Sequence, residues 1–131
     1  MENNIILNDI SYGSHERQRL DILIPQKPKN NSGLILFIHG GGWVGGDKSV
    51  HIEDARHFCN QGYISATMNY RYVSENTTVF DELDDITSAL KIIKNESEKY
   101  GFTLEKLLLS GGSAGAHLAL LYAYTRNNEA P

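Results

Sequence analysis

Residues 107–119, LLLSGGSAGAHLA, contain the strongest structural signal in this sequence. A run of three leucines comes before a cluster of small residues, and an Ala- and Leu-rich segment follows. This order predicts a short buried strand at 107–109, an abrupt turn, and a buried helix at 114–124 that is apolar almost all round. Gly111 and Gly115 lie two positions before and after Ser113, where side chains would collide with neighbouring backbone in so sharp a turn. We therefore expect Ser113 in strained backbone geometry with its hydroxyl exposed.

The rest of the chain alternates between short apolar runs and segments of helical periodicity. Further strands are predicted at 5–12, 20–24, 34–38 and 63–69, and further helices at 51–61 and 81–100. Strands that alternate with helices predict the α/β class, with a mostly parallel sheet, flanking helices and right-handed crossovers. We expect the first two strands to pair with each other as an antiparallel flap on that sheet.

Composition limits the function further. The chain has 131 residues, which suits one domain, and 40% apolar with 21% charged residues indicates a folded chain. The net charge is −4 and no basic stretch is present, so nucleic acid is not an expected partner. The apolar runs are too short to span a membrane, and the start lacks a signal-peptide pattern. The single cysteine, Cys59, excludes an internal disulfide, and a cytoplasmic protein is the prediction.

A second glycine-rich segment, HGGGWVGG at residues 39–46, follows the apolar strand at 34–38. Without side chains, its backbone N–H groups can point toward a developing oxyanion. Gly40 and Gly41 are the preferred donors, and Gly42 allows the turn. His39 is expected to orient this loop, although a strand-end histidine bonded to backbone would look the same.

The two segments together describe one active site. Ser113 would act as nucleophile on a carbonyl group, and the Ala114 N–H at the start of the helix would join the oxyanion hole, assisted by the helix dipole. The alternative is a glycine-rich turn in which Ser113 only caps the helix.

Two rival motifs point to a nucleotide-binding module. Gly40-x-Gly42-x-x-Gly45 fits a dinucleotide fingerprint, but it follows the third strand, and the next strand ends without an acidic ribose ligand. Residues 46–49, Gly-Asp-Lys-Ser, resemble a phosphate loop, but Asp47 interrupts the motif and would repel phosphate. Both motifs are weaker signals than the serine turn.

The chain resembles the N-terminal half of an α/β-hydrolase of the esterase/lipase type, and in particular the HGGGW-bearing carboxylesterases near the hormone-sensitive-lipase and feruloyl- or acetyl-esterase groups. The resemblance extends from about residue 10 to residue 124. Its motifs are Gln-Arg-Leu-Asp-Ile at 18–22, His-Gly-Gly-Gly-Trp at 39–43, Gly-Asp-Lys at 46–48, Asn-Tyr-Arg at 69–71, and residues 111–118. Residues 70–75 read Tyr-Arg-Tyr-Val-Ser-Glu where lipase-like relatives have Tyr-Arg-Leu-Ala-Pro-Glu, which favours the feruloyl-esterase-like branch.

The resemblance implies an eight-stranded, mostly parallel parent sheet and a serine hydrolase acting on small-molecule carboxylic esters. Ser113 would be the nucleophile, Gly40, Gly41 and Ala114 would supply the oxyanion N–H groups, and no metal or cofactor is implied. Short acyl or aryl esters are the expected substrates.

The family's catalytic acid and histidine should follow the serine along the chain, in that order. After Ser113 the only acidic residue is Glu129 and the only histidine is His117, on the predicted helix of the serine. His51 and His57 are expected on the solvent side of their helix, and Asp84 or Asp85 is expected to pair with Arg71.

We therefore expect residues 1–131 to be the N-terminal part of one α/β-hydrolase domain, truncated after the helix that follows Ser113. The fifth strand would then carry an unpaired apolar edge. A complementing chain or a homo-oligomer would have to complete the site. The alternative is a catalytically inactive hydrolase fragment or partner-binding piece.

Overall fold

The computed structural model describes residues 4–26, 33–41, 45–104, 106–126 and 128. Its elements, in chain order, are β1 (Ile5–Ser11), β2 (Arg19–Ile24), β3 (Gly33–Ile38), the 3-10 helix η1 (Lys48–His51), α1 (Ile52–Asn60), β4 (Ile64–Met68), α2 (Val79–Lys99), β5 (Lys106–Gly111) and α3 (Ala114–Thr125). The predicted succession of strands and helices is confirmed.

The five strands form one sheet in the order β1-β2-β4-β3-β5. Strand β3 runs parallel to both of its neighbours, β4 and β5. Strand β2 is antiparallel to β4, and β1 is antiparallel to β2. The predicted antiparallel flap is therefore present, at the edge of the sheet beside β4.

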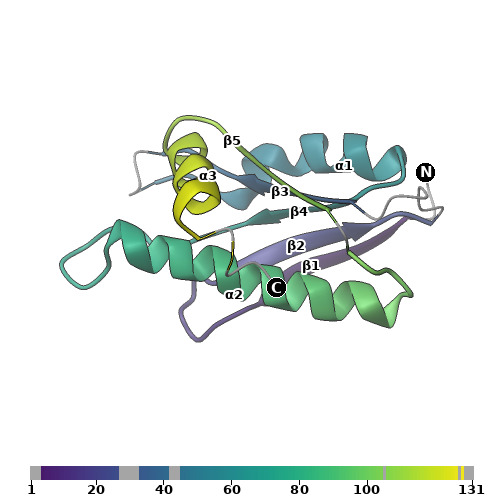
Figure 1. The fold of residues 1–131 in the computed structure, drawn as a ribbon, viewed down its shortest axis with the longest axis horizontal. Coiled ribbons are helices and arrows are strands. Elements are labelled where there is room, and N and C mark those ends of the chain that lie inside the picture. Colours follow the sequence, from purple (N-terminus) through teal and green to yellow (C-terminus); the bar gives the residue numbers. More distant parts are fainter. Residues whose placement is uncertain (1–3, 27–32, 42–44, 105, 127, 129–131) are drawn as a thin grey trace.

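Both faces of the sheet are covered by helices, with α1 on one side and α2 on the other (Figure 1). Strand β3 shows why its run is wholly apolar. Leu34, Leu36 and Ile38 belong to the larger core, which includes residues of α2 and α3. Ile35 and Phe37 pack with Ala55 and Cys59 of α1 in the smaller core. A strand buried on both faces needs apolar side chains at every position.

Two helix boundaries differ from the prediction because polar side chains begin the helices early. The helix expected from residue 51 is preceded by η1, because Asp47 accepts a hydrogen bond from the Ser49 N–H. The long helix begins at Val79 instead of residue 81, because Thr78 and Asp81 form a reciprocal capping box.

The prediction that β5 is buried is wrong, since none of its residues is fully buried, and α3 is buried on one side only. Leu107 and Leu108 of β5 are 38% and 57% exposed, and Leu120 and Tyr124 of α3 are 60% and 80% exposed. These leucines are exposed because β5 is an edge strand of the described sheet and pairs only with β3. An unpaired apolar edge at this strand was expected. A groove of about 620 Å³ runs between β5 and α3.

Among the residues that the structure describes, no helix is both long and apolar enough to cross a membrane.

Candidate active site

The carboxyl ends of β3 and β5 bring the two glycine-rich segments together. Ile38 and Gly111 are register partners at the ends of these parallel strands, so the chain leaves both strands side by side. A Cβ placed on Gly40 would lie 3.1 Å from the Ser113 Cβ and 2.7 Å from the Gly112 carbonyl oxygen. Residues far apart in sequence therefore form one site, and only glycine fits at position 40.

Ser113 has the strained backbone expected of it. Its φ of 56° and ψ of −121° lie in a region that L-residues rarely adopt, which costs roughly 1–3 kcal/mol. It occupies the N-cap position of α3, yet its side chain makes no capping hydrogen bond. The residue is also exposed. The interpretation of Ser113 as a helix cap therefore does not explain this geometry.

The glycines two positions on either side of Ser113 are required by close backbone contacts. A Cβ on Gly115 would lie 1.9 Å from the Ile38 carbonyl oxygen, and one on Gly111 would lie 2.6 Å from the same oxygen. Gly112, in contrast, has open space at its Cβ position. The predicted collision of side chains at positions 111 and 115 with neighbouring backbone is therefore confirmed.

The loop after β3 is held through His39, which is fully buried. Its Nδ1 lies 2.7 Å from the Gly40 carbonyl oxygen. The Tyr70 ring stacks on the imidazole at 4.5 Å, and the Tyr70 hydroxyl donates to the His39 carbonyl oxygen at 2.8 Å. Burial lowers the pKa of His39 below its usual value. These contacts match a histidine that orients the loop.

Gly41, the next residue, has a φ of 131°, which favours glycine. A Cβ there would also meet the Gly45 carbonyl oxygen at 2.2 Å, so the loop folds closely back on itself. The expectation for Gly42 falls outside the described residues.

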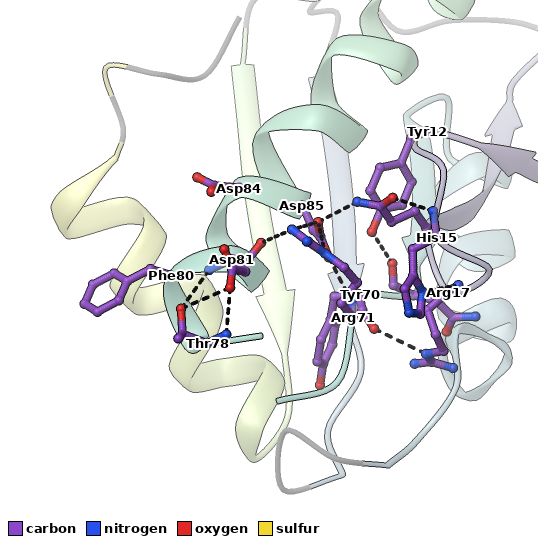
Figure 2. Close-up of polar contacts among 12 residues, drawn as sticks. Tyr12, His15, Arg17, Tyr70, Arg71, Thr78, Phe80, Asp81, Asp84 and Asp85 are labelled. Carbon is purple, nitrogen blue, oxygen red and sulfur yellow. Dashed lines mark hydrogen bonds and ion pairs between the residues drawn. The ribbon is translucent and has the colours of Figure 1, made fainter. Parts of the chain in front are cut away.

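The site also includes Arg17, which sequence reasoning missed. Arg17 comes from the connection between β1 and β2, and its Nη2 lies 3.0 Å from His39 Nε2. Its Nε–H donates to the Tyr70 carbonyl oxygen, and the two residues lie together in the close-up of this region (Figure 2). No local sequence pattern points to this contact, because Arg17 and His39 are 22 positions apart in the chain.

The candidate acids and bases have other partners. Asp85 pairs with Arg71 at 2.9 Å, as expected, and Asp84 pairs with Arg126. The prediction of a solvent-facing His51 is wrong, because its ring stacks on Phe37 at 5.5 Å and is half-buried.

The other two candidate histidines, His57 and His117, lie on helix surfaces. His57 is exposed and lies 3.0 Å from the Gln61 amide. His117 is exposed on α3, and its backbone N–H donates to the Ser113 carbonyl oxygen.

The phosphate-loop alternative is disfavoured by the same contacts that build η1. Asp47 caps η1, and the Lys48 ammonium lies 3.0 Å from an Asp21 carboxylate oxygen. The Lys48 side chain therefore already forms an ion pair with the buried carboxylate of Asp21. Across the residues that the structure describes, no group of three His, Cys, Asp or Glu side chains is placed to hold a metal ion.

The parallel strands, the strained serine turn between glycines and the glycine-rich loop define the class: this is part of an α/β-hydrolase fold. Comparison with known proteins names the family within that class. The BD-FAE family model matches residues 20–130, and the chain belongs to that family.

Individual relatives are esterases. The chain is 32% identical to a probable isoprenylcysteine alpha-carbonyl methylesterase of Oryza sativa over 87% of its own length and 27% of the relative's. It is 36% identical to the probable carboxylic ester hydrolase LipM of Mycobacterium tuberculosis, over 92% of its length and 28% of that protein. Esterase B of Lactobacillus rhamnosis superimposes with a TM-score of 0.79 at 31% identity, over 94% of this chain and 40% of that one. The chain thus spans well under half of these relatives.

Proposed function

We propose that Ser113 is the nucleophile of a carboxylic ester hydrolase. The observation that carries this proposal is the Ser113 backbone at φ 56° and ψ −121°, held between two glycines that no larger residue could replace. A turn of this kind presents a hydroxyl at the end of the sheet, free of the helix it precedes. The hydroxyl oxygen would attack the ester carbonyl carbon while the proposed histidine takes its proton, and the C–O bond to the alcohol would break as that proton passes to the leaving alcohol. Water would then hydrolyse the acyl-enzyme, which releases the carboxylic acid and restores the Ser113 hydroxyl.

The oxyanion hole is proposed to consist of the backbone N–H groups of Gly40, Gly41 and Ala114, with Gly42 allowing the turn of the loop. Two observations support it: Gly40 approaches Ser113 closely, and Ala114 is the first residue of α3, whose positive dipole end faces the site. Removing one such donor typically costs about 10²–10³ in rate.

The catalytic acid and histidine are proposed to come from outside residues 1–131, which would form the N-terminal part of one domain. A complementing chain or a second copy would then cover the apolar groove between β5 and α3. The exposed leucines at this edge support a covering polypeptide. They equally support the alternative of an inactive hydrolase chain that binds a partner.

The proposed substrates are small carboxylic esters with short acyl or aryl groups, in keeping with relatives named as a methylesterase and a carboxylic ester hydrolase. The reaction needs no cofactor. A cytoplasmic location remains a prediction from the sequence.

Acetylation of Ser113 by p-nitrophenyl acetate tests the proposal. Mass spectrometry would locate the acetyl group, and free imidazole would be added as a substitute base. We expect imidazole to raise the Ser113-dependent rate about ten- to a hundredfold, because a positioned base contributes about 10²–10⁴ and a free one is less well placed.

The controls are Ser113→Ala and Ser110→Ala. Each removes one serine hydroxyl, and the two positions are three residues apart. Only Ser113→Ala should abolish the imidazole-dependent reaction. Equal acetylation in wild type and Ser113→Ala, or no acetyl group on Ser113, would contradict the proposed role.

A further inference from the structure

The two ring nitrogens of His39 face partners of opposite chemistry. Arg17 Nη2 lies 3.0 Å from Nε2, and a guanidinium group can only donate. His39 Nε2 must therefore accept, and so carries no proton. The Gly40 carbonyl oxygen lies 2.7 Å from Nδ1, and a carbonyl can only accept. Nδ1 must therefore carry the proton.

We infer that Arg17 is a positioning residue that holds His39 as the neutral Nδ1–H imidazole, and that this ring in turn fixes the Gly40–Gly41 peptide of the oxyanion loop. The inference about Arg17 and His39 rests on contacts alone. Its catalytic consequence rests on the proposed function of Ser113.

The peptide geometry gives the consequence. In a trans peptide the C=O and N–H bonds point in opposite directions. Because the Gly40 carbonyl is turned toward His39 Nδ1, the Gly41 N–H faces away from His39. Gly41 is exposed and follows the residue that approaches Ser113, so the hydrogen bond from His39 orients the proposed oxyanion donor.

Arg17 is itself held in place on several sides. Its guanidinium carbon lies 3.9 Å from the centre of the Tyr72 ring, its Nε–H donates to the Tyr70 carbonyl oxygen at 3.2 Å, and Asp47 lies 3.8 Å from Nη1. The side chain is only 15% exposed. A guanidinium fixed in this way has little freedom to leave His39.

On the side of the loop, Gly46 packs closely against the hydrogen bond between His39 and Gly40. A Cβ on Gly46, whose φ is 91°, would lie 2.1 Å from the Gly40 carbonyl oxygen and 2.5 Å from His39 Nδ1. The Gly46 carbonyl oxygen in turn accepts a hydrogen bond from the Tyr72 hydroxyl at 2.7 Å. Tyr72 therefore contacts both the Arg17 guanidinium, which faces the His39 ring, and Gly46, which packs against the hydrogen bond between His39 and Gly40.

Without Arg17, His39 could gain a proton at Nε2 while keeping its bond to Gly40. The charged or ionisable groups that act on His39 are Arg17 from the β1–β2 connection, Asp47 before η1 and His51 within η1. Arg17 and His51 oppose a second proton on the ring, whereas Asp47 favours it. Of these three groups, Arg17 is the one that lies within hydrogen-bond distance of His39 Nε2.

Nitrogen-15 NMR of the histidine rings in the intact chain tests the inference. His39 is assigned through its contacts with the Tyr70 ring. In the wild type at neutral pH we expect a protonated Nδ1 and an unprotonated Nε2. A proton on Nε2 in the wild type would overturn the inference without any variant.

The variant is Arg17→Met, which keeps the side-chain length and removes the donors. We expect Nε2 of His39 to gain a proton at higher pH than in the wild type, and Ser113 acetylation to slow by about ten- to a hundredfold, as small misplacements of a site can do. Arg19→Met is the matched control. Arg19 is the first residue of β2 and pairs with Asp9 of β1, so this substitution should leave the His39 spectrum unchanged. An unchanged His39 spectrum in folded Arg17→Met would contradict the inference.

The inference and the proposed function fail separately. Ser113→Ala should keep the wild-type His39 spectrum, because the hydrogen bonds of the ring do not involve Ser113. Lack of Ser113 acetylation with an intact Nδ1–H signature would reject the hydrolase proposal alone. A proton on Nε2 together with normal Ser113 acetylation would reject the role of Arg17 alone.

Discussion

Single glycines decide whether the serine turn can form. Gly115 packs its Cα against the last residue of β3, with the Ile38 carbonyl oxygen where a Cβ would be, at 1.9 Å. The strain at Ser113 is therefore maintained by contacts of its neighbours, and the surrounding backbone has no room to relax it.

Gly115→Ala should destabilise the chain by about 3 kcal/mol or more, because the new methyl group would force β3 and α3 apart. The free energy of unfolding in urea measures this effect. Gly112→Ala is the matched control: its Cβ meets nothing within 4 Å, so a change within about 0.5 kcal/mol is expected. Equal unfolding midpoints for the two variants would show that the close contact at Gly115 is not present.

At the scale of elements, two ion pairs attach α2 to its surroundings in different ways. Asp85 is 1% exposed and accepts hydrogen bonds from Arg71 and from Gln18 of the β1–β2 connection. Asp84, one residue earlier, is 58% exposed and pairs with Arg126 at the end of α3. The Asp85 contacts appear in Figure 2.

Arg71→Met should cost about 3 kcal/mol or more in unfolding free energy, because it leaves the Asp85 carboxylate buried without its cation. Arg126→Met should cost less than about 1 kcal/mol, since the aspartate it pairs with is exposed to water. Thermal or urea unfolding of both variants makes the comparison. A larger loss of unfolding free energy in Arg126→Met than in Arg71→Met would contradict this prediction.

The elements themselves could be predicted, because each is encoded locally. The run at 34–38 is apolar at every position, and α2 repeats apolar residues at helical spacing. The early start of α2 was missed although Thr78 and Asp81 have the spacing of a capping box. The exposure of β5 could not be read from its leucines, because an apolar run looks the same at the centre and at the edge of a sheet.

For the molecule as a whole, the buried carboxyl group of Glu82 couples stability to pH. Glu82 is fully buried, and neither of its carboxylate oxygens has a hydrogen-bond partner in the described part of the chain. Burial and the nearby negative charge of Asp85 raise the pKa of Glu82 from 4.5 to about 8. Between these two values the folded chain binds a proton that the unfolded chain has lost.

Stability should therefore fall as pH rises from about 5 to about 8, by at most about 1.4 kcal/mol per pH unit from this group. Glu82→Gln is neutral at every pH and should remove this contribution. Urea unfolding of both proteins across the range gives the difference between their free energies, which should grow in favour of Glu82→Gln with rising pH. A constant difference would mean that Glu82 ionises in the folded chain as it does in the unfolded one.

Sequence patterns were enough to predict the α/β class, the order of the elements and the two segments of the candidate site, because strand runs, helix periodicity and glycine spacing are local properties. The reason for glycine at 111 and 115 was also available, since a sharp strand-to-helix turn excludes side chains there. The sequence likewise indicated that His39 orients its loop.

The folded structure was needed to establish the strand order and the contact of Arg17 with His39. These depend on pairings between residues distant in the chain, and no local pattern specifies which distant residue a side chain will meet. Arg17 reaches the site because the β1–β2 connection and the residues after β3 and β4 come together at one end of the sheet.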